Sequence, residues 1–521
     1  MEQNPFQKPG NLDTGAPATE LVAGPDLSRL GALARSGALW TLGRTVTRNV
    51  INLGTTAVLA RLLTPRDYGL VGMVYTLTAF LNIFSDMGLS WATVQRKELT
   101  KAQVDNLFWI NVGAGTVLWG LCAAAGPALT WFYGPVELRR MAAILGASFF
   151  LSGVAVQPLA LLKRQMRLKH VAVAELISIA TGSACGLAVA VVGGGYWALV
   201  CQVLTLQGAR ALAFLVASGF RPSWFRFGQG TFGLLKFGGA LALGGVFAYI
   251  SSVLDRILLG RIWGAQELAY YGRAWFLMAL PGLLVVVTLG EVVRPALCAV
   301  QDDTARFERV YRKAVGLLAF ASMPMVMGML AAAPEIVRFF YGPQWAQVVA
   351  PLRWLLVANL CGPVAASFGW VYVAKGRPRI TLLLSAGLAA LVSVTSSVGC
   401  RWGAEGVAIG RLVAGTIILG PSFWFAHSVG GLRWRSTLLV VVRPLAVASA
   451  MGAVVLVVGR VVLGLSPLWQ LRLVVEVVTG VVVFLVLGCL FCRDVVRETF
   501  RSVAMLLSGG RVSTQGSTDV G

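Results

Sequence analysis

Charged residues are scarce in this chain of 521 residues, and acidic residues are scarcer than basic ones. Only 13% of the residues are charged, while 57% are hydrophobic. A typical soluble domain carries roughly 25% charged residues. This composition excludes a soluble enzyme, a disordered protein and a disulfide-stapled secreted domain, and it predicts many membrane-spanning helices. The chain has 44 Lys and Arg but only 22 Asp and Glu. In a membrane protein such an excess of basic residues reflects which side of the bilayer each loop faces, so we expect no nucleic acid partner.

Side chains that carry out chemistry are also few. The two histidines, His170 and His427, lie at predicted helix ends, and almost all of the eight cysteines lie in apolar runs. Cys489 and Cys492 form a C-x-x-C without a second pair nearby, which favours apolar packing over a metal or redox site. Because the phosphate-binding pattern G-x-x-x-x-G-K-[ST] does not occur, the chain is not expected to hydrolyse ATP. We therefore expect no enzyme activity, no cofactor and no metal site.

Fourteen apolar runs are long enough to cross a membrane. A spanning helix needs about 20 mostly apolar residues, because the hydrocarbon core is roughly 30 Å thick and each residue rises about 1.5 Å. The sequence therefore predicts an all-α integral membrane protein with about 14 transmembrane helices. The runs lie near 37–60, 69–92, 105–127, 140–162, 171–193, 196–217, 236–260, 268–298, 314–334, 347–373, 380–400, 404–427, 437–463 and 470–492.

Basic residues are distributed unevenly among the connections between these runs. The two tails and every second connection hold about 25 Lys and Arg, whereas the alternate connections hold about seven. The densest segments are KRQMRLK (163–169), RFERVYRK (306–313) and KGRPR (375–379). The positive-inside rule therefore predicts that the tails at 1–35 and 493–521 are both cytoplasmic. The N-terminal tail is polar and lacks the apolar centre of a signal peptide.

Several short motifs occur twice, in the same order and at a nearly constant offset. Such motifs also recur at membrane interfaces through composition alone, but the shared order and offset favour an internal repeat. The pairs are WFYGP (131–135) with FFYGP (339–343), GYWALV (195–200) with GAEGVAIG (403–410), and LARLLTPRDYGLVG (59–72) with LGRIWGAQELAYYG (259–272).

The repeat predicts two pseudo-symmetric six-helix lobes around a central cavity. We expect an N-lobe at 36–217, a cytoplasmic linker at 218–235, a C-lobe at 236–428 and two additional helices at 434–492. Because six is an even number, the two lobes have the same orientation in the membrane, as in alternating-access transporters.

Two arginines in the first apolar run are the leading candidates for function. A charge at a helix centre costs about 2.5–3.5 kcal/mol on insertion scales and usually faces protein or water. Arg44 and Arg48 are four residues apart and Asn52 continues the same stripe, so the three share one helix face. Two interpretations are open: they line a cavity for an anionic substrate, or they pair with an acid from another helix. Arginine suits phosphate because its planar group donates two hydrogen bonds.

Other charges inside the predicted helices are mostly basic, which favours an anionic cargo. The side chains of Arg210 and Arg443 could equally line a cavity or reach along the helix to the membrane–water interface. Asp86, Glu175 and Asp255 are candidates for proton or ion coupling or for pairing between the lobes. The remaining basic candidates are Lys236, Arg256, Arg273, Arg353 and Arg411, and the other intramembrane acids are Glu291 and Glu476.

Two segments resemble a known family of transporters. The segment VLARLLTPRDYGLVGMVYTLTAFLNIFSDMGLS (58–90) strongly resembles the first hairpin of the bacterial polysaccharide transporter family, the Wzx-type flippases of the multidrug/oligosaccharidyl-lipid/polysaccharide exporter superfamily. Asp255-Arg256 followed by LGRIWGAQELAYYGRAW (259–275) resembles the start of that family's second lobe. The resemblance covers about residues 36–430, and the DMGLS and LKRQMRL elements look most like the branch that exports exopolysaccharide units.

The resemblance implies a flippase in the bacterial inner membrane. Such a protein moves oligosaccharide repeat units linked to undecaprenyl pyrophosphate across the membrane by alternating access, for exopolysaccharide, capsule or O-antigen assembly. It implies membrane lipids, a polysaccharide polymerase and a chain-length regulator as partners, and a monomer is expected. Phosphate or acidic sugars would contact Arg44, Arg48, Asn52, Lys236, Arg256, Arg273, Arg353 and Arg411.

Three other functions remain open. A flippase for the lipid-linked peptidoglycan precursor would have the same composition and a cationic cavity. A multidrug or cation antiporter of the same superfamily would need an acidic lumen, whereas the first run carries Arg44 and Arg48. A structural membrane protein would have little use for intramembrane arginines, because they are costly to insert.

Arg48→Ala tests the leading interpretation. We expect this variant to abolish polysaccharide export while the protein still reaches the membrane, because the anion would lose a central contact. Surface polysaccharide and membrane localisation are measured together. A normal amount of surface polysaccharide would remove Arg48 from the mechanism.

Overall fold

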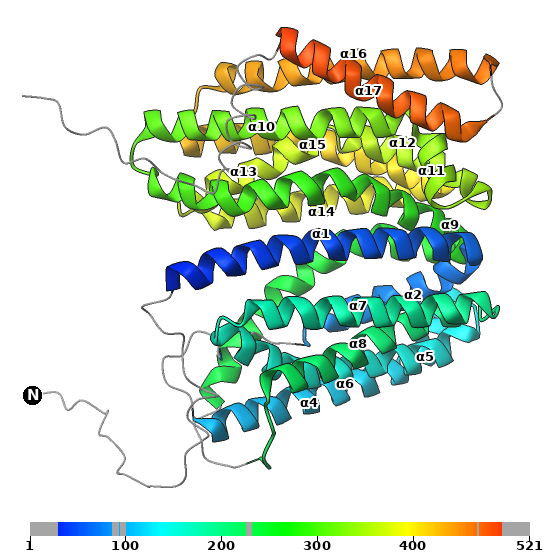
Figure 1. Ribbon diagram of the computed structural model, residues 1–521, viewed down its shortest axis with the longest axis vertical. Coiled ribbons are helices and arrows are strands. Elements are labelled where there is room, and N and C mark those ends of the chain that lie inside the picture. The colour runs from blue at the N-terminus through cyan, green and yellow to red at the C-terminus, as the bar shows by residue number, and fades with distance from the viewer. Residues whose placement is uncertain (1–29, 86–92, 94–99, 226–231, 466–467, 492–521) are drawn as a thin grey trace, which may run out of the picture. The chain divides into compact units, whose positions relative to one another are not determined.

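The computed structural model describes residues 30–85, 93, 100–225, 232–465 and 468–491. Within these residues there is no strand, and helices follow one another with short connections (Figure 1). The expected all-α class is therefore confirmed. The helices are α1 (Leu30–Leu62), α2 (Pro65–Asn82), α4 (Lys101–Ala124), α5 (Gly126–Tyr133), α6 (Glu137–Arg164), α7 (Leu168–Val191), α8 (Trp197–Ser218), α9 (Phe232–Ala299), α10 (Thr304–Ala331), α11 (Ala333–Phe340), α12 (Val349–Ala358), α13 (Gly362–Ala374), α14 (Pro378–Gly399), α15 (Gly403–Gly430), α16 (Trp434–Leu465) and α17 (Trp469–Phe491).

The described part of each predicted apolar run falls mainly on one or more of these helices, and residues 86–92 of the run at 69–92 lie outside the described residues. Among the described residues, nine helical segments are long and apolar enough to cross a membrane, or ten if one bent pair counts as a single span. One of the nine, Arg379–Gly430, contains two predicted runs. Helix α1, which carries Arg44 and Arg48, is not among the nine.

The run predicted at 347–373 is not one straight helix. It consists of α12 and α13, whose axes are bent by 43° relative to each other. Pro363 lies in the first turn of α13, where it lacks an N–H and its ring blocks continuation of the preceding helix. At the break, the side-chain amide of Asn359 donates a hydrogen bond to the carbonyl of Met278 at 3.2 Å.

The repeated motifs have similar local structures. WFYGP ends the short helix α5 and FFYGP ends α11, and each helix has eight residues with proline in its first turn. Gly134 and Gly342 follow them with φ of 103° and 92°, a conformation that glycine adopts without steric cost. The second pair of motifs behaves likewise, since Gly195 and Gly403 have φ of 53° and 67° just before or at the start of α8 and α15.

The chain divides into two compact units. The first unit contains residues 1–59 and 77–246, and the second contains 60–76 and 247–521. These boundaries differ from the predicted lobes in two places. Residues 60–76, predicted in the N-lobe, lie in the second unit, and residues 236–246, predicted in the C-lobe, lie in the first. Helices α16 and α17 also lie in the second unit.

Side-chain hydrogen bonds explain why the end of α1 belongs to the second unit. The last four carbonyls of a helix have no partner within it. Here the carbonyl of Ala60 accepts from Gln344 Nε2 and from Trp345 Nε1, both at 2.8 Å, and that of Leu63 accepts from Gln344 at 3.1 Å. The buried Trp345 ring also meets Tyr68 edge-on, with the ring centroids 5.4 Å apart.

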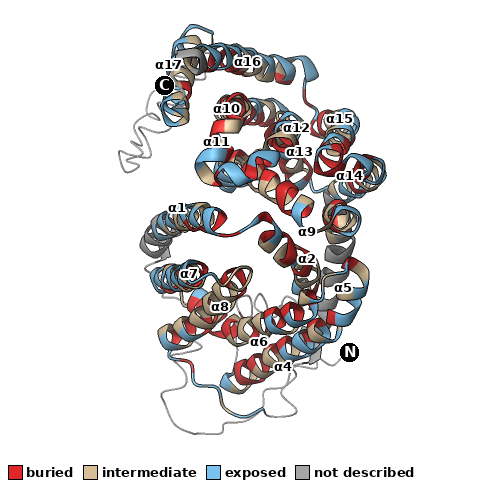
Figure 2. Cartoon of the chain, turned by 90° about the vertical axis from the view of Figure 1, so that its right-hand side faces the viewer, coloured by how far each residue is buried: buried red, intermediate tan, exposed pale blue. Residues whose placement is uncertain are grey.

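Each unit has its own apolar core. Leu162, Val171 and Phe214 join α6, α7 and α8 in the first unit, whereas Tyr311 and Trp370 join α10 and α13 in the second. Within each unit, buried residues lie on the helix faces that contact other helices, and exposed residues lie on the faces that point outward (Figure 2). Because lipid requires no polar outer face, the many exposed valines and leucines of α17 suit a bilayer.

Glycines allow the closest helix contacts, as is common in membrane proteins. In the first unit, a Cβ on Gly115 or Gly153 would lie 2.5 Å from a main-chain carbonyl oxygen of the facing helix, α6 or α4 respectively. In the second unit, a Cβ on Gly69 would overlap the main-chain carbonyl of Ala265.

We expect Gly69→Ala to destabilise the protein by about 1–3 kcal/mol, the usual cost of overpacking, because two backbones would have to separate. Gly72→Ala, one turn along α2, is the matched control, since its new methyl group would meet only the side chain of Leu268 at 3.5 Å. Thermal unfolding of the detergent-solubilised variants measures the difference. Equal midpoints for the two variants would contradict the close contact.

Candidate functional site

A cluster of three charged side chains lies in the first unit. Arg44 of α1 donates from Nη1 to Glu175 Oε2 of α7 at 2.8 Å. Arg210 of α8 lies on the other carboxylate oxygen, with Nη2 3.5 Å from Glu175 Oε1. The three side chains are 21%, 34% and 14% exposed for Arg44, Arg210 and Glu175. One carboxylate therefore holds two guanidinium groups that come from different helices.

This cluster retains unused positive charge and unused donors. The Nε atoms of Arg44 and Arg210 are buried and have no hydrogen-bond partner. Arg48 lies one turn further along α1 and is half-buried. Within the described part of the chain, no hydrogen bond or ion pair involves its guanidinium. Two arginines thus share one carboxylate, and a third lies one turn along α1. A planar guanidinium is well suited to bind phosphate or carboxylate oxygens.

The two interpretations of the α1 arginines apply to different residues. Arg44 pairs with an acid from another helix, which was the structural alternative. Arg48 has no such acid among the described residues, so it keeps the charge that an anionic ligand would neutralise. Asn52, the third member of the stripe, is half-buried.

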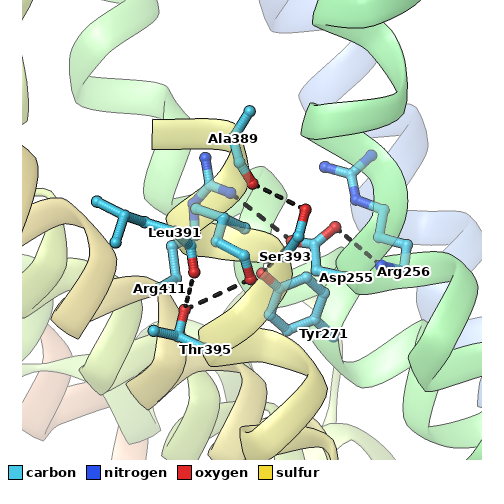
Figure 3. Close-up of polar contacts among 9 residues, drawn as sticks. Asp255, Arg256, Tyr271, Ala389, Leu391, Ser393, Thr395 and Arg411 are labelled. Atoms are coloured by element: carbon cyan, nitrogen blue, oxygen red, sulfur yellow. Dashed lines mark hydrogen bonds and ion pairs between the residues drawn. The ribbon is translucent and has the colours of Figure 1, made fainter. Parts of the chain in front are cut away.

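A second charged cluster lies in the second unit, around Asp255 of α9. This carboxylate is 1% exposed and its Oδ2 accepts from the hydroxyl of Tyr271 at 2.7 Å. Arg411 of α15 lies 3.7 Å from the same oxygen, and the main-chain N–H of Arg256 donates to Oδ1 at 2.8 Å (Figure 3). Each carboxylate oxygen therefore has a partner, as burial of a charge requires.

The guanidinium groups of this second cluster gather at one aromatic ring. Arg411 lies 4.0 Å from the centroid of Trp275 and Arg256 lies 5.2 Å from it, distances typical of cation–π contacts. In Figure 3 the dashed line from the Asp255 carboxylate to Arg256 ends at the main-chain nitrogen of Arg256 and not at its guanidinium. The Arg256 Nε is buried without a hydrogen-bond partner. Two guanidiniums and one carboxylate leave this cluster with net positive charge.

Glu175 and Asp255 were predicted as coupling residues or as acids that pair the two lobes. The ion pairs that the structure shows for each of them are formed within a single unit. Both acids offset arginines that were predicted to bind substrate, so the clusters have fewer free charges than the sequence alone indicates.

The remaining predicted residues are not part of these clusters. The guanidinium of Arg273 lies over the Tyr68 ring, 4.1 Å from its centroid, and Arg353 is exposed. The side chain of Lys236 and all of Asp86 lie outside the described residues. No group of three His, Cys, Asp or Glu among the residues that the structure describes could hold a metal ion.

Three residues of the two charged clusters were missed or given too little weight in the sequence-based prediction. Arg210 was considered equally able to extend to the interface, yet it binds Glu175. Tyr271 and Trp275 were not singled out. Their spacing of four residues places both on one helical face, and this is the signal that could have revealed them.

Comparison with known proteins identifies the family. The model of the family described as polysaccharide biosynthesis protein matches residues 58–350, which is more than half of the chain. The chain belongs to this polysaccharide biosynthesis protein family.

The sequence matches to two curated relatives extend over most of this chain. It is 24% identical to the teichuronic acid biosynthesis protein TuaB of Bacillus subtilis, over 92% of this chain and 98% of that protein. It is 26% identical to the lipopolysaccharide biosynthesis protein WzxC of Escherichia coli, over 73% of this chain and 77% of that protein. The chain is therefore a multi-pass membrane transporter of polysaccharide biosynthesis.

Solved structures show the same fold at low identity. The lipid II flippase MurJ in an inward closed conformation matches with a TM-score of 0.71 and 15% identity, over 88% of this chain and 100% of that chain. An inward-facing multidrug resistance transporter of the MATE family, within the MOP superfamily, matches with a TM-score of 0.54 and 15% identity, over 73% and 95%. These matches establish the transporter fold of the polysaccharide biosynthesis protein.

The second cluster yields a stability prediction. We expect Asp255→Asn to cost about 3–5 kcal/mol, because it leaves the partly buried Arg411 without its counter-charge. The double variant Asp255→Asn/Arg411→Gln should lose less, since no unpaired charge remains. Glu291→Gln is the control, because the Glu291–Arg294 pair is 77% and 48% exposed and such pairs contribute about 0–1 kcal/mol. Thermal unfolding separates these outcomes, and equal effects of Asp255→Asn and Glu291→Gln would contradict the assignment.

Proposed function

We propose that this protein is a flippase that moves an oligosaccharide linked to a polyprenyl pyrophosphate across the bacterial inner membrane. The observation that carries the proposal is the excess of arginine over acid around Glu175 in the first unit. Charges inside a membrane helix are costly and usually serve a function. The names of the relatives support a polysaccharide cargo, since they concern teichuronic acid, lipopolysaccharide and succinoglycan.

The pyrophosphate is the group that best fits the first-unit arginines. Arg48 is without a counter-charge among the described residues, and Arg44 and Arg210 each have a buried Nε without a partner. A diphosphate offers several oxygens to such donors, and bonds between charged groups are roughly twice as strong as neutral ones. Binding the anion would neutralise the excess charge of the cluster in a region that water does not solvate well.

Glu175 has a defined role in this proposal. In the absence of substrate it holds Arg44 and Arg210 in place, and their orientation is therefore set before the anion arrives. A pyrophosphate would share or take over these contacts, because it carries two negative charges whereas a carboxylate carries one. Release of the anion would return the arginines to Glu175, which favours turnover over permanent binding.

The transport cycle follows from the shared fold and the proposed cargo. We infer alternating access, in which the binding site is open first to the cytoplasm and then to the outer side. The polyprenyl chain would remain in lipid, because its transfer to a polar site would lose the free energy of apolar burial. The uneven distribution of Lys and Arg supports cytoplasmic termini.

Depletion of the protein in its own host tests this function. We expect a lipid-linked oligosaccharide to accumulate, measured by mass spectrometry, while the corresponding polymer disappears from the surface. Accumulation of the lipid-linked peptidoglycan precursor together with cell lysis would instead indicate the peptidoglycan function. If neither lipid pool changes, the cargo is not a lipid-linked glycan and drug efflux becomes the function to test.

A variant of Arg210 tests the arginine cluster. Arg210→Ala should lower export by about tenfold or more, because a hydrogen bond to a charged group is worth about 1.5–3 kcal/mol. Arg140→Ala is the matched control, since Arg140 is an exposed arginine near the start of α6. Surface polysaccharide is normalised to the amount of protein in the membrane. Unchanged export in Arg210→Ala would exclude this residue from substrate binding.

A further inference from the structure

A third charged cluster lies in the second unit, and its balance of charge is opposite to that of the first two. Arg472 of α17 has its Nε 3.0 Å from Glu335 Oε1 of α11 and 3.0 Å from Glu476 Oε1 of α17. The side chains of the two acids are 5% and 1% exposed, and that of Arg472 is 19% exposed. Two buried carboxyl groups therefore share one guanidinium.

The Arg472 Nε–H donates a hydrogen bond to Glu476 Oε1 at 3.0 Å, and Glu335 Oε1 forms an ion pair with the same nitrogen. Because both distances start at the same nitrogen, the two Oε1 atoms are at most twice 3.0 Å apart. Like charges at such a separation oppose each other's ionisation. The second oxygens, Oε2 of Glu335 and Oε2 of Glu476, are buried and have no hydrogen-bond partner. An unpaired buried carboxylate oxygen is costly, and protonation of one carboxyl group removes that cost.

Among the described residues, no basic side chain other than Arg472 forms an ion pair with Glu335 or Glu476. Arg338 of α11 lies over the ring of Trp469, 5.3 Å from its centroid, and Arg353 of α12 and Arg460 of α16 are exposed. On α16, Gly459 lies against Glu476, since a Cβ there would overlap the Oε1 atom. The basic residues of α10 lie in its first turns, at the end of that helix far from α11.

We propose that Glu335, Glu476 and Arg472 form a proton-binding site that holds one exchangeable proton. With both acids ionised the cluster has a charge of −1, and binding of one proton from the aqueous phase makes it neutral. The proton forms an O–H bond at one of the two unpartnered Oε2 atoms and returns to water when it leaves, so no other bond is made or broken.

Position along the helices gives this site access to water. Arg472 is the fourth residue of α17 and Glu335 is in the first turn of α11, so both lie within about 5 Å of a helix end at 1.5 Å per residue. With the predicted cytoplasmic termini, these helix ends face the outer side of the membrane. The site is separate from the arginine clusters and does not depend on the identity of the cargo.

Infrared difference spectroscopy of the full-length protein in lipid nanodiscs tests the proposal. Spectra are recorded as the pH is raised from about 6, where exposed glutamates with an ordinary pKa near 4.3 are already ionised. We expect a carboxylic-acid C=O band equivalent to one carboxyl group, which disappears as the pH rises. The control Glu291→Gln, which removes an exposed acid, should retain this band.

Single substitutions distinguish a shared proton from an ordinary buried acid. Glu335→Gln and Glu476→Gln should each abolish the whole band, because the remaining carboxylate then forms a neutral one-to-one pair with Arg472. Absence of the band from the unsubstituted protein, or its persistence in both variants, would overturn the proposal and leave an ion cluster that only joins α17 to α11. Since no substrate is present, either result is independent of the proposed flippase function.

Discussion

Charge inside an apolar membrane is the constraint on which the rest of this structure depends. The carboxylates of Glu175, Asp255, Glu335 and Glu476 each contact a guanidinium. The ratio of the two groups differs from cluster to cluster. Glu175 and Asp255 each lie between arginines, so these sites are short of negative charge. Glu335 and Glu476 share Arg472, so that site is short of positive charge. The first kind of cluster suits an anion and the second suits a proton.

Backbone features place these side chains. Glycines allow α4 to contact α6, and proline bends the chain between α12 and α13. The side chains of Gln344 and Trp345 bind carbonyls at the end of α1. Helix α1 thus carries arginines of the first unit and ends in the second, so a single helix belongs to both compact units.

Much of the fold could be predicted because its signals are local. The apolar runs coincide with helices, and the motifs at 131–135 and 339–343 both end short helices at a glycine with positive φ. The candidate site was predicted less completely. Arg44 and Arg48 could be selected by their spacing on one face. That spacing does not reveal that Glu175, 131 residues after Arg44, pairs with Arg44 and forms no ion pair with Arg48. Glu335 was not selected at all, because it lies in a short helix outside the predicted runs.

The sequence by itself determined the helical class, the membrane environment, the family and the excess of basic over acidic residues. These properties depend on composition, on the length of apolar runs and on short motifs, which can all be read without knowing which residues meet in space. Only the tertiary structure decided which charges neutralise one another. Pairing depends on distances of 3–4 Å between helices that are far apart in the chain, and the free energy of a buried charge depends on whether such a partner is present. For that reason the arginines of α1, indistinguishable by type and spacing, differ in their partners: Arg44 pairs with Glu175, whereas Arg48 forms no ion pair among the described residues.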